Sequence, residues 1–115
     1  MPLQDITILA LTVAATGTIG ACRFVTPAGA QAGADANTLG VCRVAAVAGD
    51  KIPVNVLGTS VVEAGAAIAA GATLKSDASG RAITWATSGA KVGLALEAAS
   101  GAGAFIEVLL IPNVA

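Results

Sequence analysis

The spacing of glycines in VEAGAAIAAGATLKSDASGRA, from Val62 to Ala82, sets the strongest limit on how this chain can fold. Eight of these 21 residues are alanine, the best helix former, yet Gly65, Gly71 and Gly80 interrupt them. A helix over Val62–Leu74 would carry two glycines at about 1 kcal/mol each, and it would lack an N-cap after TSVV. The backbone of this stretch therefore does not favour a helix.

A flexible linker is also disfavoured, because isolated apolar residues recur every six positions at Val62, Ile68 and Leu74. We expect a strand and a turn, then one short helical or 3₁₀ turn at Ala66–Ala70, with Gly71 in a left-handed or extended conformation. The turn residues of this stretch, where small side chains let the backbone pass close to its neighbours, are Gly65, Gly71, Asp77 and Gly80.

Two segments alternate apolar and polar residues, as half-buried strands do. Lys51–Leu57 is the first, and Pro53, which lacks an N–H, predicts an edge position or pairing on one side only. In the second, Lys91–Glu97, we expect Val92, Leu94 and Leu96 to point inward and Lys91, Gly93, Ala95 and Glu97 to point outward.

Two other segments, Ile6–Val13 and Phe105–Ile111, are apolar on both faces. Such strands are covered on both sides, and in a chain this small we expect a neighbouring subunit to cover at least one of them. On the outer face of the second segment, Phe105, Leu109 and Ile111 accompany Glu107 and are the candidate subunit interface.

Shorter strands are expected at Cys22–Thr26, Val41–Val47, Thr59–Glu63, Thr73–Ser76 and Ala82–Ala86, with a long ordered loop over Pro27–Gly40. No internal repeat or linker divides the 115 residues. The sequence predicts a single all-β domain over residues 1–115.

Charged residues make up only 11% of the chain and hydrophobic residues 56%. The chain must hide surface either in a membrane or against other protein chains. The longest uncharged run, Ile6–Cys22, has 17 residues rich in Thr and Gly, which is short for a spanning helix. Burial against protein is therefore favoured. Nucleic acid is disfavoured as a partner, because the net charge is −1 and the six cations form no run.

The residues available for chemistry are few, since the chain has no His. Catalysis is disfavoured, and we expect neither a metal nor a cofactor. Asp35 and Asn37 lack the further oxygen ligands of a calcium loop, and Cys22 and Cys42 are expected to be buried thiols rather than a disulfide.

Three further side chains have more than one interpretation. Glu63 and Glu97 are either partners of Arg81, Arg43 or Lys91 across a subunit interface, or charges at strand ends with a local capping role. Trp85 is expected to pack in the core or in an interface.

From about Gly40 to Pro112 the chain resembles the small capsid cement, or head decoration, proteins of tailed bacteriophages. The family has a V-E-A-G-x-x-I-x-x-G segment with a glycine shortly before it, and the residues that match this first part are Gly58, Val62, Glu63, Ala64, Gly65, Ile68 and Gly71. Those that match the following S-D-x-x-G-R-A turn are Ser76, Asp77, Gly80, Arg81 and Ala82. Those that match G-x-A-L-E-A-A-S are Gly93, Ala95, Leu96, Glu97, Ala98, Ala99 and Ser100.

The resemblance implies a small β-barrel or β-clip domain, similar to a β-tulip, with at most one or two short helical turns. It also implies a homotrimer that is made in the host cytoplasm, sits on the outer capsid surface of the virion and clamps subunits of a major capsid protein with an HK97-like fold. Residues 1–16 would form either an arm facing the capsid, with Pro2, Leu3, Gln4, Asp5 and Ile6 as contacts, or the first strand of the domain. The alternative is a β-clip module of the SAF type that binds a small molecule or a carbohydrate.

Overall fold

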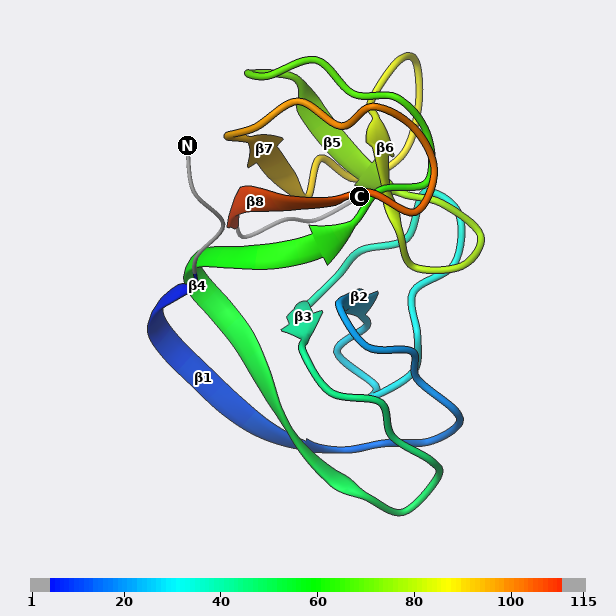
Figure 1. Ribbon diagram of the computed structural model, residues 1–115. Coiled ribbons are helices and arrows are strands. Elements are labelled where there is room, and N and C mark those ends of the chain that lie inside the picture. Colours follow the sequence, from blue (N-terminus) through cyan, green and yellow to red (C-terminus); the bar gives the residue numbers. More distant parts are fainter. Residues whose placement is uncertain (1–4, 111–115) are drawn as a thin grey trace.

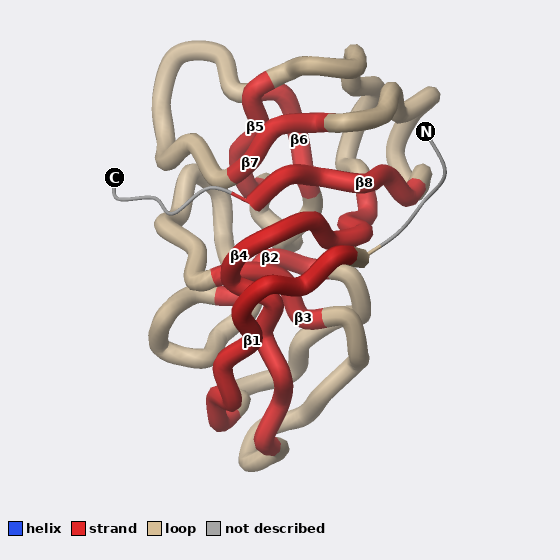
Figure 2. The backbone as a smooth tube through the Cα atoms, turned by 90° about the vertical axis from the view of Figure 1, so that its left-hand side faces the viewer, coloured by secondary structure: helices blue, strands red, loops and turns tan. Residues whose placement is uncertain are grey.

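Residues 5–110 are described by the structure, a computed structural model, and they form strands without any helix (Figure 2). The eight strands are β1 (Ile6–Ala14), β2 (Arg23–Val25), β3 (Gly40–Cys42), β4 (Lys51–Glu63), β5 (Thr73–Ser76), β6 (Ala82–Thr84), β7 (Gly93–Ala95) and β8 (Phe105–Leu110). The all-β prediction is confirmed. The expected strand over Val41–Val47 is shorter, because the chain leaves the sheet after Cys42.

All eight strands belong to one antiparallel sheet that curls into a nearly closed barrel (Figure 1). The strand order is β2-β3-β4-β8-β7-β5-β6, and β1 pairs with β4 outside this path. In Figure 1, β5 to β8 lie in the upper part of the molecule, whereas β1 and the first half of β4 form a long ribbon below them.

Strand β4 connects these two parts of the molecule, because its 13 residues run through both. Its first half pairs with β1 and β3, and its second half pairs with β8 from Thr59 to Glu63. The sequence predicted two strands here. They join because Gly58 adopts φ +104° and leaves room for the Ile6 carbonyl, which a Cβ at this position would strike. Pro53 pairs with Thr12 of β1 alone, as its missing N–H predicted.

Two clusters of buried side chains form the interior. The larger cluster fills the upper part and includes Phe24, Val62, Leu74, Ile106 and Val108. The smaller one lies under the β1–β4 ribbon and consists of Ala15, Ile19, Val25, Cys42, Ala46, Ile52 and Val54. The two ends of β4 therefore contribute to different cores.

Successive residues of the β4–β8–β7 sheet point to opposite faces. Ser60, Val108 and Ala95 lie beside one another across the three strands, and all three are buried. The prediction for Lys91–Glu97 is wrong after Val92, because Gly93 and Ala95 point inward while Leu94 is only half-buried. Gly93 is required there, since a Cβ would meet the Val108 side chain at 2.6 Å and the Leu109 carbonyl oxygen at 2.9 Å.

Residues 62–82 contain the end of β4, strand β5 and the start of β6, joined by turns and bridges rather than by a helix. Gly71 and Gly80 have φ of +84° and +75°, so the left-handed conformation expected at Gly71 is confirmed. The helical turn expected at Ala66–Ala70 is wrong: Ile68 forms a bridge with Ala99, and the two residues exchange backbone hydrogen bonds of 3.0 and 2.8 Å. This pairing across the sheet satisfies the backbone groups that a helical turn would otherwise have used.

Candidate subunit and capsid interfaces

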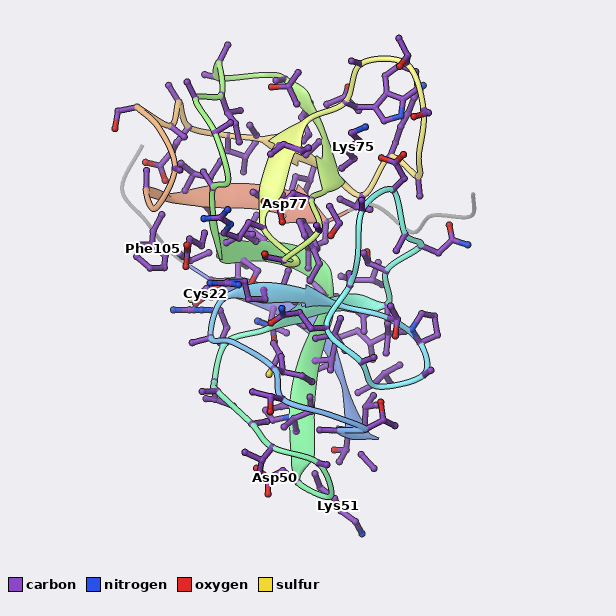
Figure 3. The ribbon with its side chains drawn as sticks, turned by 90° about the vertical axis from the view of Figure 1, so that its right-hand side faces the viewer. Cys22, Asp50, Lys51, Lys75, Asp77 and Phe105 are labelled. Atoms are coloured by element: carbon purple, nitrogen blue, oxygen red, sulfur yellow. The ribbon has the colours of Figure 1, made fainter. Side chains whose placement is uncertain are left out.

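The outer face of β8 carries two of the three predicted interface residues. Phe105 is 49% exposed and Leu109 is 39% exposed, whereas Ile106, Val108 and Leu110 on the opposite face are buried. Figure 3 shows the Phe105 ring at the edge of the molecule, directed away from the strands. The third predicted residue, Ile111, lies outside the described residues.

This outer face continues across neighbouring strands without a charge at the level of Leu109. Thr59 of β4 pairs with Leu109 on one side and with Ile6 of β1 on the other. Leu94 of β7 pairs with Leu109 from the opposite side. Residues paired in this way place their side chains on the same face. We call this row, Ile6–Thr59–Leu109–Leu94, the outer row. All four members are exposed or half-buried.

Between Phe105 and Leu109, Glu107 is only 1% exposed, and its Oε1 has no hydrogen-bond partner among the described residues. Glu97 lies beside it and accepts a hydrogen bond of 3.1 Å from the Glu107 backbone N–H. Of the two interpretations of Glu97, the structure therefore shows the local role. Nothing in the sequence indicated the burial of Glu107, because a single acid in an apolar strand ordinarily faces water.

Strand β1 is the most exposed apolar segment of the described chain. Ile8 is 76% exposed, and Ile6, Leu9 and Leu11 are also exposed. The sequence indicated that this strand is apolar on both faces and predicted cover on both. Within residues 5–110 that cover is absent, and only Val13 packs partly against the smaller core.

The start of β1 bears on the capsid-binding prediction. Asp5 forms an ion pair with Arg43 and accepts a hydrogen bond of 2.7 Å from the Val61 N–H, and Ile6 begins the pairing with β4. From Ile6 onward the segment is thus the first strand of its own sheet. The other predicted capsid contacts, Pro2, Leu3 and Gln4, lie outside the described residues.

An ion-pair network lies beside Phe105, where the two parts of the molecule meet. Glu63, which pairs with Phe105 across the strands, contacts Arg23 at 3.2 Å and Arg81 at 3.6 Å. Arg81 also contacts Asp77 at 3.2 Å. Glu63 thus has its cationic partners within its own chain rather than across a subunit interface.

Asp77 organises the turn that the family motif occupies. Its Oδ1 accepts backbone hydrogen bonds from Ser79 and Arg81, at 2.8 and 2.9 Å. Gly65 faces this carboxylate closely, and a Cβ there would strike Asp77 Oδ2. Gly65 therefore makes room for the Asp77 side chain. The sequence had suggested that the small residues of this motif make room for neighbouring backbone.

Both cysteines are free and buried, as predicted. Cys22 adopts φ +58°, and its sulfur accepts a hydrogen bond of 3.2 Å from Arg43 Nε. Burial raises the pKa of the Cys22 thiol; the Glu63 carboxylate and Cys42 add to this effect, and Arg23 opposes it.

Polar side chains gather at one more place, the loop that follows β6. Asp35 contacts Lys75 at 2.7 Å and accepts a hydrogen bond from Ser88 Oγ. The hydrogen bond from Lys75 lowers the pKa of the Asp35 carboxyl below its ordinary value. Trp85 packs under the Lys91 ammonium group, 4.5 Å from the ring centre. Asp35, which was considered above as a possible calcium ligand, thus forms an ion pair with Lys75.

Residues 5–110 contain no pocket, and they hold no group of three or more His, Cys, Asp or Glu side chains placed to bind a metal ion. No helix long and apolar enough to cross a membrane occurs in this range. The described residues therefore offer no binding pocket that would support the alternative interpretation, a module that binds a small molecule or a carbohydrate.

Comparison with known proteins agrees with the resemblance seen in the sequence. The N base of the head fiber gp8.5 of bacteriophage phi29 shares the fold, with a TM-score of 0.73 and 19% identity over 93% of this chain and 97% of that one. No curated protein sequence matches. A family model described as phage cement protein matches residues 3–110. The chain therefore belongs to the phage cement protein family, and its role is a structural one at the phage capsid.

Proposed function

We propose that this protein is a homotrimeric decoration subunit on the outer surface of a tailed-phage capsid, where it stabilises contacts between major capsid protein subunits of an HK97-like fold. It acts by burying surface between shell subunits and does not act as an enzyme. Protein that binds only the assembled shell shifts the equilibrium away from the dissociated shell.

One observation carries the proposal: large apolar side chains of β1 and β8 are exposed on a single small domain that has no pocket within residues 5–110. A monomeric protein rarely leaves such a surface open to water. Phe105 and Leu109, with Ile111, are proposed to contact neighbouring copies, and the segment Pro2–Ile6 is proposed to contact the capsid. Both assignments extend the family membership to particular residues of this chain.

Capsids that lack this protein, prepared from the phage that encodes it, provide the test. Purified protein is added, and the particles are examined by electron microscopy and by heating. We expect added density in groups of three on the outer surface and a higher temperature for loss of shell integrity. Capsids that gain neither density nor heat resistance would refute the proposal.

Alanine substitutions at Gln4 and Asp5 test the proposed capsid contact against a control at Lys51, which lies at the far tip of the ribbon (Figure 3). We expect the first pair to weaken capsid binding and Lys51→Ala to leave it unchanged. Asp5 also pairs with Arg43, so a melting curve must accompany the Asp5 variant. Equal binding by all variants would remove this segment from the contact.

A further inference from the structure

We infer that β1 from Ile8 onward is a subunit interface of the trimer, and that this part of the strand in one copy packs against the outer face of β8 in the next copy in a head-to-tail ring. The inference rests on the proposed function for the presence of three copies. It goes further by assigning two different surfaces of this chain to each other.

The exposure of β1 on both faces is the first argument. Leu11 pairs with the buried residue Val54 and shares its face, whereas Ile6 shares the opposite face with Thr59 and Leu109. Both Leu11 and Ile6 are exposed. A twofold dimer supplies each subunit with one neighbour, but a closed ring of three supplies two. A ring therefore gives each subunit one neighbour at β1 and a second neighbour at the outer face of β8.

The unpaired edge of β1 is the second argument. Among residues 5–110, β1 forms a ladder only with β4, so its other edge has no strand partner. From Ile6 to Ala14 the strand has no charge and no proline. Soluble proteins protect long edges of this kind with charges, proline or a covering element. Cover from another chain fulfils that need here.

The nature of the covering surface is the third argument. An uncharged strand is best covered by an apolar surface, and the chain displays one at Phe105, Leu109 and Leu94. The charged side chains nearest to Phe105 form a network of two acids and two arginines within the chain, Glu63 and Asp77 with Arg23 and Arg81. A second copy thus offers β1 a matching partner.

The exposed side chains supply a substantial share of one contact. The large apolar side chains concerned are Ile8, Leu9 and Leu11 on β1 of one copy and Phe105 and Leu109 on β8 of the next. Each would expose about 150–200 Å² in full and roughly half of that here, so together they offer on the order of 400 Å² to one contact. A standard interface buries about 1,600 Å² over both partners. These side chains therefore provide about a quarter of that area, and the remaining surface of the strands has to provide the rest.

The first experiment changes β1 alone. Ile8→Glu places a charge in the proposed interface, and Val47→Glu places the same charge at a 58% exposed valine in the loop before β4. In sedimentation of the isolated protein at micromolar concentration, we expect three-copy particles for the wild type and Val47→Glu and single copies for Ile8→Glu. A wild type of one or two copies, or an Ile8→Glu protein that still sediments as three, would overturn the inference.

The second experiment tests the head-to-tail arrangement. Ile8→Glu retains an intact β8 face, and Leu109→Glu retains an intact β1. We expect each variant alone to be a single copy and the mixture to form a one-to-one pair, because one good contact remains between them. Formation of that pair also shows that both variants are folded. If mixing changes nothing, or if each variant already pairs with itself, the two surfaces do not bind each other.

These outcomes are separate from those of the proposed function. A wild type that forms the ring but does not bind capsids refutes the capsid role and leaves the interface assignment standing. A wild-type monomer whose capsid binding is lost in Ile8→Glu refutes the interface assignment, and it identifies the capsid as the occupant of β1.

Discussion

Strands β1 and β8 have nearly the same sequence character, yet they differ in what covers them. Both are apolar on two faces, but β8 packs Ile106, Val108 and Leu110 into the larger core, whereas β1 leaves Ile8 and Leu11 in contact with solvent. The difference comes from position: β8 lies between β4 and β7 within the sheet, and β1 is attached outside the main strand order. An apolar sequence therefore predicts that a strand will be covered, and within residues 5–110 the chain itself provides that cover for one face of β8 but not for β1.

The largest effect is expected from truncating the buried face of β8. Ile106→Ala should lower the free energy of unfolding by about 2–5 kcal/mol, because it leaves a cavity in the larger core. Leu11→Ala on β1 should cost little in a dilute solution of single copies. Its deficit in Tm relative to the wild type should grow with protein concentration, as cover from other copies is lost.

Thermal melts over a wide range of concentrations provide this measurement. The deficit of Ile106→Ala should remain almost constant over that range. A deficit of Leu11→Ala that does not vary with concentration would break the comparison, because β1 would then be stabilised within its own chain.

A second effect sharpens the description of β8. Glu107 is a buried acid whose Oε1 has no partner among the described residues. Replacing it with methionine keeps a similar shape and removes the unpaired oxygen. Glu107→Met should raise the free energy of unfolding by about 1–3 kcal/mol in denaturant titrations. Glu97→Gln is the control for the neighbouring carboxylate, and destabilisation by Glu107→Met would show that the acid has a structural partner.

A third effect, a loss of about 1 kcal/mol in the free energy of unfolding, is expected from substitutions in the turn before β5. Gly71 has φ +84°, and a Cβ at this position would meet no atom within 4 Å, so its cost of substitution comes from the backbone alone. Gly71→Ala should be destabilising by about 1 kcal/mol and Gly71→Val by more. Gly101→Ala is a matched control, since Gly101 has equal space and no positive φ. A stabilised Gly71→Ala protein would contradict the left-handed turn.

The smallest effect concerns the pH dependence near the junction of the two cores. The pKa of Cys22 is raised in the folded protein, mainly by burial. The protonated thiol therefore contributes its stability below the unfolded-state pKa, near about 8.5, and loses it as the pH rises through the higher folded-state pKa. As the pH rises above about 8, the wild type should lose stability more steeply than Cys22→Ala. Parallel curves for the two proteins would contradict the shift.

Local rules were sufficient for much of the fold. The alternation of apolar and polar residues predicted that Ile52 and Val54 are buried. The missing N–H of Pro53 predicted pairing on one side only, and the conformational freedom of glycine predicted the turns at Gly71 and Gly80. Contacts between distant segments were beyond these rules. Ile68 joins Ala99 across 31 positions, and this pairing replaces the expected helical turn.

The exposure of the residues proposed for the interface was predictable to a similar degree. Phe105 and Leu109 followed from the apolar outer face of their strand. The burial of Glu107 and the partners of Glu63 did not, because both depend on which strands become neighbours. Gly93 shows the same limit: its inward direction follows from the close approach of Val108 and Leu109, and alternation counted from Val92 predicted the opposite face.

The length of β4 also determines how the protein responds to mechanical force. One strand carries hydrogen-bond ladders of both cores, with β1 and β3 along its first half and β8 along its second. In an antiparallel ladder these bonds stand perpendicular to the strands. Tension along β4 therefore shears many bonds together, whereas tension across it would peel them apart one after another. A load applied along β1 would thus be shared by the whole ladder and transmitted through continuous backbone into the other half of the molecule.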